Sequence, residues 1–239
     1  MINIYWKTGI AEEAINAVIE GAKKFERIIS VPESEVVVRG ADRTVNEYAR
    51  GIHRINGMFD AGTMNNWLSS MNPKEINVFL ADEPICNEDG SYCLGLTRGI
   101  CTVVSTKSVR NMSSLAPLVM HEIGHAHGMT NGERPYVTHI QGYHCTQPNC
   151  LMQQSFGVDA FERRLPASRK NGWFCKTCVE WAKICNARKG WYQTKNTAPN
   201  LPPRRPCLPP RHPDLTPRRR SLPPRRVGLR PLPPRVEPN

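Results

Sequence analysis

Residues 115–128 read LAPLVMHEIGHAHG, and this stretch decides both the fold and the site that the chain can form. Ser113 or Ser114 can cap a helix that starts here, and Pro117 falls in the first turn, where its missing N–H costs nothing. Gly128 suits a left-handed residue that ends the helix. The apolar residues follow a helical period: Leu118, Val119, Ile123 and Ala126. We therefore expect one helix whose apolar face packs on a core.

The same helix carries His121-Glu122-Ile123-Gly124-His125, a His-Glu-x-x-His motif. Residues four apart on a helix face the same way, so His121 and His125 can hold one zinc ion. Glu122 then reaches a water molecule on that ion and can act as a general base when the water attacks a carbonyl group. Two His and a Glu on a solvated helix face are the alternative interpretation.

The sequence beyond the helix supports a metal site. Gly128, three residues after His125, lets the chain turn back and bring a third ligand, but the usual position of that ligand holds Asn131. Closely spaced Cys pairs follow, and such pairs are the usual ligands of a closed, tetrahedral structural zinc site. The residues concerned are His144, Cys145, Cys150, Met152, Cys175 and Cys178.

At these residues the sequence resembles the archaemetzincin family of zinc metallopeptidases. The resemblance implies that His144 is the third ligand of a catalytic zinc and that Met152 is the Met-turn residue beneath that metal. It also implies a second, structural zinc, and hence two zinc ions per chain. Glu122 would be the catalytic residue, and the structural zinc would bind four thiolates: Cys145, Cys150, Cys175 and Cys178.

The chain departs from the family pattern just before the third ligand. Sixteen residues separate Gly128 from Cys145 where the pattern has three, so 13 residues, most simply 130–142, are inserted. A surface loop can absorb such an insertion at a modest entropic cost, because closure entropy grows only logarithmically with length. The insertion also brings His139, which competes with His144 for the third ligand position.

The first hundred residues alternate between strand and helix patterns. Short apolar or β-branched runs predict four strands, at 2–6, 36–38, 76–80 and 100–104, and we expect 36–38 to be buried. Helical periods predict helices over 11–29 and over 44–55, the second opened by a capping box at Thr44 and Glu47. This alternation favours an α/β layer with a mostly parallel sheet. Together with the resemblance, this alternation implies a metzincin-like α/β (α+β) fold with a mixed, mostly parallel sheet and helices. One of the helices would be the active-site helix, and a four-cysteine zinc site would stabilise a small C-terminal subdomain.

We expect three parts: an N-terminal α/β subdomain over 1–128, a zinc-stabilised subdomain over 129–195 and a disordered Pro/Arg-rich tail over 196–239. From residue 199 onward ten Arg, one Asp and one Glu give a net charge of +8, out of +11 for the whole chain. Leu-Pro-Pro-Arg occurs four times there, which is typical of extended polyproline. The tail could be a spacer, bind a polyproline-recognising partner, or attract nucleic acid or anionic membrane. Because the rest of the chain is nearly neutral, we do not expect nucleic acid as its main partner.

The nine Cys are an odd number, and their spacing indicates metal ligation before disulfides. Cys86 and Cys93 flank a Glu-Asp-Gly turn, where a disulfide is the alternative to two packed thiols. A helix is expected around Cys178 and Cys185, ending before residue 190, and His127 is expected at the surface or behind the metal ligands. Neither a secretory leader nor an apolar run of 18 residues occurs, so we expect a cytoplasmic protein without a transmembrane segment, most simply a monomer.

The leading hypothesis is a zinc-dependent metallopeptidase that hydrolyses peptide bonds in peptide or protein substrates. An edge strand, with 100–104 as the candidate, could align the substrate by backbone pairing. The alternative is a catalytically impaired, zinc-stabilised binding module, in which the insertion has disabled the site and the basic tail recruits a protein or nucleic-acid partner. The third ligand distinguishes the two, because two His alone form a weak metal site.

Overall fold

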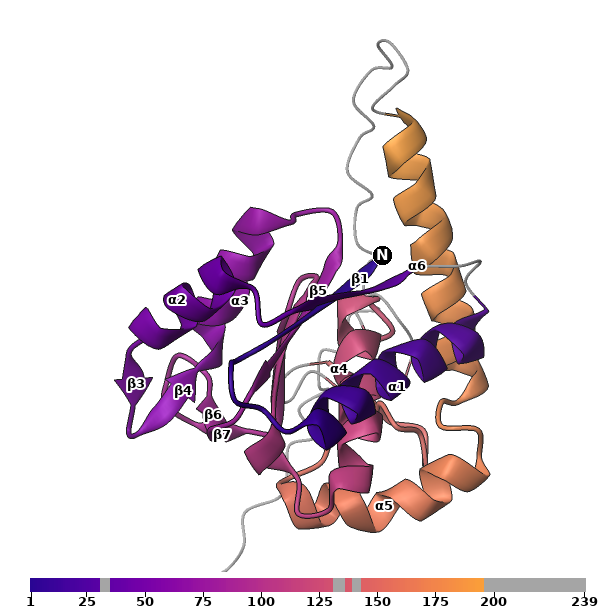
Figure 1. The fold of residues 1–239 in the computed structure, drawn as a ribbon. Coiled ribbons are helices and arrows are strands. Elements are labelled where there is room, and N and C mark those ends of the chain that lie inside the picture. Colours follow the sequence, from indigo (N-terminus) through magenta and orange to yellow (C-terminus); the bar gives the residue numbers. More distant parts are fainter. Residues whose placement is uncertain (31–34, 131–135, 139–142, 196–239) are drawn as a thin grey trace, which may run out of the picture. The chain divides into compact units, whose positions relative to one another are not determined.

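A five-stranded sheet forms the centre of the fold in the computed structural model of the chain (Figure 1). Its strands are β1 (Ile2–Trp6), β2 (Val36–Gly40), β5 (Ile76–Ala81), β8 (Gly95–Arg98) and β9 (Cys101–Ser105). They lie in the order β2-β1-β5-β9-β8, and all neighbours are parallel except β8, which runs antiparallel to β9 at one edge. The predicted mixed, mostly parallel sheet is confirmed.

The structure describes residues 1–30, 35–130, 136–138 and 143–195, without the side chains of 186–195. The chain divides into two units, 1–198 and 199–239, and the second unit, with its Leu-Pro-Pro-Arg repeats, lies outside the described residues. Disorder of the tail and its binding partners therefore stay predictions. Among the described residues, no helix combines the length and apolar character needed to cross a membrane.

Helices cover both faces of the sheet (Figure 1). The helices of the described residues are α1 (Glu12–Ile29), α2 (Arg43–Gly51), α3 (Ala61–Met71), α4 (Leu115–Ala126), α5 (Val158–Lys170) and α6 (Lys176–Lys195), and the first four cover the sheet. Val78 and Leu80 of β5 belong to one core, which they share with α1 and α4. Phe79 and Ala81 belong to a second core with α2 and α3. Because successive strand residues point to opposite faces, one fully buried strand supplies both layers.

Two predictions for the N-terminal part are wrong. The N-cap of α2 is Asp42, whose carboxylate accepts a hydrogen bond from the backbone N–H of Val45 at 3.0 Å, so the helix does not open with a capping box at Thr44 and Glu47. β2 is also not buried, since the side chain of Val38 is 49% exposed. The reason is topological: β2 lies at the outer edge of the sheet, opposite β8.

Short strands from the segments before and after β5 form a second, four-stranded sheet. Its strands are β3 (Arg54–Ile55), β4 (Met58–Asp60), β6 (Ile85–Cys86) and β7 (Tyr92–Cys93). Ile85 pairs with Cys93 and Cys86 pairs with Tyr92, so the side chains of the two Cys point to opposite faces of the ribbon. Both are free thiols, and burial raises the pKa of the Cys93 thiol to about 12. The alternative of a disulfide at this turn is wrong.

The C-terminal part packs against α1 and α4. β10 (Val137–Thr138) and β11 (His144–Cys145) form a two-stranded ribbon, and α5 and α6 follow it. Phe161 of α5, Trp173 and Phe174 are buried in the same core as α4. The last helix extends to Lys195, so the prediction that it ends before residue 190 is wrong.

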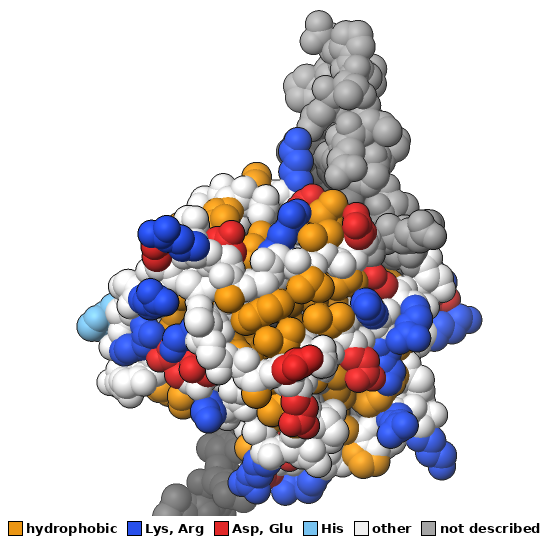
Figure 2. Space-filling view, viewed as in Figure 1, with side chains coloured by type: hydrophobic (Ala, Val, Ile, Leu, Met, Phe, Trp, Pro, Cys, Tyr) orange, Lys and Arg blue, Asp and Glu red, His pale blue; other side chains and the backbone are white. Residues whose placement is uncertain are grey.

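Charged side chains surround an apolar area on the face shown in Figure 2. Lys and Arg are scattered around the edge of that face, with Asp and Glu among them, and hydrophobic side chains gather near its centre. The described residues on this face therefore form no continuous basic surface of the kind that binds a nucleic-acid backbone.

Candidate active site and metal centres

The chain leaves α4 through a turn made by Gly128, whose φ is +74°. The N–H of Gly128 donates to the carbonyl of His125 at 2.8 Å, and the N–H of Met129 donates to the carbonyl of Gly124 at 3.0 Å. These two bonds define a Schellman motif, which favours glycine at the left-handed position. The predicted helix stop is confirmed. The turn brings the hydroxyl of Thr130 to within 2.8 Å of Nδ1 of His125.

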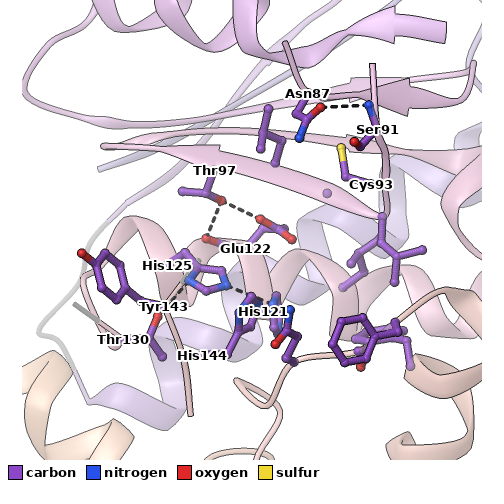
Figure 3. A pocket seen from close by; sticks show the side chains of 18 of the residues that line it. Asn87, Ser91, Cys93, Thr97, His121, Glu122, His125, Thr130, Tyr143 and His144 are labelled. Carbon is purple, nitrogen blue, oxygen red and sulfur yellow. Dashed lines mark hydrogen bonds between the residues drawn. The ribbon is translucent and has the colours of Figure 1, made fainter. Parts of the chain in front are cut away.

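Three imidazole rings meet at this end of the helix (Figure 3). One ring nitrogen from each of His121, His125 and His144 lies within 4.8 Å of the others, so the three can hold a metal ion. The ring centroids of His121 and His125 are 4.7 Å apart, and His144 lies 5.4 Å from the first and 4.8 Å from the second. The structure thus brings His144 next to the two residues of the helical motif.

The orientation of the rings fits a bound cation. Nδ1 of His121 donates to the carbonyl of Leu151 at 2.7 Å, which leaves the lone pair of the neutral ring on Nε2. This Nε2 lies 3.1 Å from Nε2 of His125, close to the separation of about 3.4 Å expected for two nitrogens on one zinc. Burial and the neighbouring His144 lower the pKa of His121 to about 3, and burial lowers that of His125. Both rings are therefore neutral, as metal ligands must be.

The inserted segment itself holds the strand that carries His144. Val137 pairs with Cys145 and Thr138 pairs with His144 in the antiparallel ribbon of β10 and β11. The N–H of Thr146 also donates to the carbonyl of Tyr136 at 2.9 Å. The extra residues therefore form backbone bonds with the ligand strand. The competing candidate, His139, lies outside the described residues.

Glu122 points from α4 toward the edge strand β8 (Figure 3). Its carboxylate oxygen Oε2 accepts a hydrogen bond from the hydroxyl of Thr97 at 2.6 Å. Burial raises the pKa of Glu122 to about 7, and the hydrogen bond from Thr97 opposes this shift. A carboxyl group with a pKa near neutrality is suited to accept and return a proton.

The imidazoles and the carboxylate share one cleft of about 920 Å³. β8 and the preceding loop form one wall of the cleft, and Tyr143 and the segment from Gln154 to Gly157 also line it. Leu118 and Phe161 contribute apolar lining beside the imidazoles. The cleft is large enough for several residues of an extended peptide.

A second possible metal site includes Cys150, the residue before Leu151. The sulfur atoms of its four Cys lie within 4.8 Å of one another. Cys145 and Cys175 are 3.7 Å apart and Cys150 and Cys178 are 3.4 Å apart, against about 3.8 Å for sulfurs bound tetrahedrally to one zinc. Three of the four are buried, and none of them lines the cleft. This is the arrangement of a closed structural site.

A partly buried Arg side chain near Cys150 supports this interpretation. Nε and Nη2 of Arg164 are buried without a hydrogen-bond partner, and Nη1 donates to the carbonyl of Gln154 at 2.8 Å. Burial lowers the pKa of Arg164, and Cys150 acts in the opposite direction. A buried charge without a counter-charge is costly, and four thiolates around one zinc ion carry a net negative charge that would compensate it.

Met152 lies directly against α4, the helix that carries His121 and His125. A side chain at Gly124 would overlap the sulfur of Met152, so glycine lets this side chain pack beneath the His motif. The preceding residue, Leu151, is the one whose carbonyl holds His121. The backbone between the two possible metal sites therefore contacts both.

Other polar residues lie near the site. His127, expected at the surface or behind the metal ligands, is buried and packs on Phe25, with ring centroids 4.9 Å apart, so the surface alternative is wrong. Thr97 and Thr130, which contact Glu122 and His125, were not identified from the sequence. A single Thr has no spacing pattern that would reveal a contact across the sheet.

Comparisons with known proteins agree with this architecture. No protein-family model and no curated protein matches the sequence. Several solved structures are similar, among them the following three. An archaemetzincin from Methanopyrus kandleri is 20% identical, with a TM-score of 0.55, over 78% of this chain and 95% of that one. A zinc-dependent peptidase from Methanocorpusculum labreanum is 15% identical, with a TM-score of 0.54, over 76% and 100% of the two chains. An archaemetzincin from Archaeoglobus fulgidus, complexed with malonate, is 16% identical, with a TM-score of 0.50, over 76% and 99%. The chain therefore has an archaemetzincin-like fold.

Proposed function

We propose that the chain is a zinc-dependent metallopeptidase that hydrolyses peptide bonds in its cleft. The observation that carries the proposal is the meeting of three imidazoles and one buried carboxylate in a single large cleft. The solved structures of similar fold, which are named as archaemetzincins and a zinc-dependent peptidase, support the same reaction class. His121, His125 and His144 are the proposed zinc ligands.

Each residue of the cleft then has a chemical role. Zinc, when bound by the three imidazoles, supplies a Lewis acid that polarises a carbonyl group and lowers the pKa of a water molecule. The carboxylate of Glu122 accepts the proton that the attacking water loses and passes it to the amide nitrogen of the leaving peptide. The carbonyl of Leu151 and the hydroxyl of Thr130 orient His121 and His125 through their Nδ1 atoms.

The strand available to align a substrate is β8. The expected candidate, 100–104, corresponds to β9, which lies between β5 and β8 and is fully buried, so that expectation is wrong. Among the described residues β8 pairs with β9 alone, and it lines the cleft beside Glu122. An extended peptide could pair with its open side and so lie across the site.

We further propose that the four thiols bind a second, structural zinc, which gives two zinc ions per chain. Small subdomains with little apolar core commonly depend on a metal for folding. Here the metal would join the Cys145–Cys150 segment to the start of α6. The three-part organisation, the monomeric state and a cytoplasmic location stay predictions.

The experiment that tests the proposal compares the wild-type chain with Glu122→Gln. Glutamine keeps the size of the side chain but cannot accept the proton, so chelator-sensitive cleavage of a peptide library should fall by at least about 1000-fold, while zinc content is unchanged. A wild-type chain without chelator-sensitive cleavage, or a variant that cleaves as well as wild type, would contradict the proposal. The alternative binding module required that the insertion displace the third ligand, and the position of His144 beside the motif supports the peptidase instead.

A further inference from the structure

The carboxylate of Glu122 rests on a strand, and two residues of that strand contact it. Thr97 donates to its Oε2 atom at 2.6 Å and also lies 3.1 Å from its backbone carbonyl. On the strand two positions earlier, a Cβ atom at Gly95 would lie 2.5 Å from Oε1 and 2.6 Å from Cδ and Cγ of Glu122. Residues 95 and 97 project from the same face of β8, so both meet the same side chain.

The hydroxyl of Thr97 can be assigned a direction. Its single proton goes to the carboxylate, because this is the shorter and charge-assisted contact. The oxygen then accepts a hydrogen bond from the hydroxyl of Thr102, 2.8 Å away on β9. Thr97 and Thr102 are direct cross-strand partners, and Thr102 is fully buried. The two hydroxyls thus form a chain of hydrogen bonds, with fixed direction, that ends on Glu122.

Gly95 contributes by having no side chain. Its backbone conformation is open to other residues, since its φ is not positive, so the requirement for glycine comes from the close approach of Glu122 alone. With an alanine here, the carboxylate would have to leave its place over β8. It is buried and held by Thr97, so it has no equally good position to move to.

We propose that Gly95 and Thr97 of β8 are positioning residues for the general base, one by leaving room for the carboxylate and the other by holding its Oε2 atom. The proposal rests on the proposed function of Glu122. Holding Oε2 against β8 fixes the orientation of the carboxylate. It also places the base against the strand that can pair with a substrate, so β8 would position both the carboxylate and the peptide.

The test compares Thr97→Val with Thr97→Ser, each in the full chain loaded with zinc. Valine keeps the shape but loses the hydroxyl, and kcat should fall about 10- to 100-fold, as expected for loss of a hydrogen bond to a charged group. KM and zinc content should stay within about twofold, because Thr97 contacts no candidate ligand. Serine restores the donor and should recover most of kcat. A residue that only stabilised the strand would not give a kcat-only loss that serine rescues.

Two further variants separate the contributions. Gly95→Ala should lower kcat at least as much as Thr97→Val, with both zinc ions retained, because it displaces the carboxylate. Thr102→Val should have a smaller effect, because Thr97 can still donate to Glu122. The control is Thr44→Val, which changes an exposed Thr of α2 that does not line the cleft. Melting temperatures of all variants show whether a loss of rate comes from unfolding.

The outcomes distinguish this inference from the proposed function. If the wild type cleaves peptides, Glu122→Gln does not, and Thr97→Val has the wild-type kcat, the inference is wrong and the proposed function stands. It is equally wrong if Thr97→Ser is as impaired as Thr97→Val while both remain folded. If the wild type shows no chelator-sensitive cleavage, the proposed function and the inference fail together.

Discussion

The two clusters of possible metal ligands differ in their access to solvent and in their neighbours. The three imidazoles lie in a cleft of about 920 Å³ with a carboxylate beside them. The four thiols are largely buried, lie outside the lining of that cleft, and have the guanidinium group of Arg164 nearby. An open site leaves room for substrate and water, whereas a closed site with four protein ligands can only hold the chain together. The difference predicts that the two sites respond differently to substitution.

The largest effect is expected from Cys178→Ser, which removes one ligand of the closed site. We expect the loss of that zinc and of near-UV circular dichroism from the C-terminal part, since metal binding and folding are coupled there. The cleft zinc should weaken as well, because the carbonyl of Leu151, the residue next to Cys150, orients His121. Cys185→Ser, on the same helix and outside the cluster, is the control and should retain two zinc ions. Retention of both ions by Cys178→Ser would show that the thiols hold no metal.

His144→Ala should affect the open site alone. The chain should fold with one zinc ion left, and peptide cleavage should fall below about 0.1% of wild type, because two imidazoles leave too weak a metal site. Metal analysis and circular dichroism check these outcomes together. His53→Ala, at an exposed position, serves as the control. If His139→Ala instead removes the cleft zinc while His144→Ala does not, the third ligand has been assigned to the wrong residue.

Residues behind the ligands should sharpen the comparison: Thr130 contacts His125 of the open site, and the charge of Arg164 acts on Cys150 of the closed site as well as on His121. Thr130→Val removes the partner of His125 and should weaken zinc binding in the cleft about 10- to 100-fold. Arg164→Met removes the charge near Cys150 and should speed zinc release from the thiol site by a similar factor. Competition with a chromogenic chelator resolves the two ions by their release rates. Arg164→Lys, which keeps the charge, is the control. Equal effects of Thr130→Val and Arg164→Met on both ions would show that the sites do not act separately.

The smallest expected effect concerns the packing between the sites. Gly124→Ala would force its Cβ against the sulfur of Met152 and should destabilise the chain by about 1–3 kcal/mol, the usual cost of overpacking a core. In a thermal melt this corresponds to a decrease of several degrees. Gly51→Ala is the matched control, since no atom lies within 4 Å of its added Cβ, and its melting temperature should change by less than about two degrees. An unchanged melting temperature for Gly124→Ala would mean that Met152 can move aside.

Local patterns in the sequence predicted the elements that have a clear apolar periodicity or a recognisable end residue. The helix around the His-Glu-x-x-His motif, its stop at Gly128 and the strands at 2–6 and 76–80 are present, with boundaries within a residue or two. α3, α5 and β8 were not predicted. α3 contains a mixture of apolar and amide residues, α5 includes Pro166, and β8 is a four-residue strand with only partial burial. Such segments take their structure from packing against neighbours, which a single sequence does not display.

The sequence by itself determined the candidate ligands, because metal chemistry restricts them to a few residue types and helix geometry fixes the spacing of His121 and His125. It also determined the α/β class, because apolar runs typical of strands alternate along the chain with segments of helical periodicity. Only the tertiary structure decided that the ribbon carrying His144 returns to α4 across the insertion. It alone placed Thr97 and Gly95 against Glu122, because contacts across a sheet join residues whose separation in sequence follows no rule.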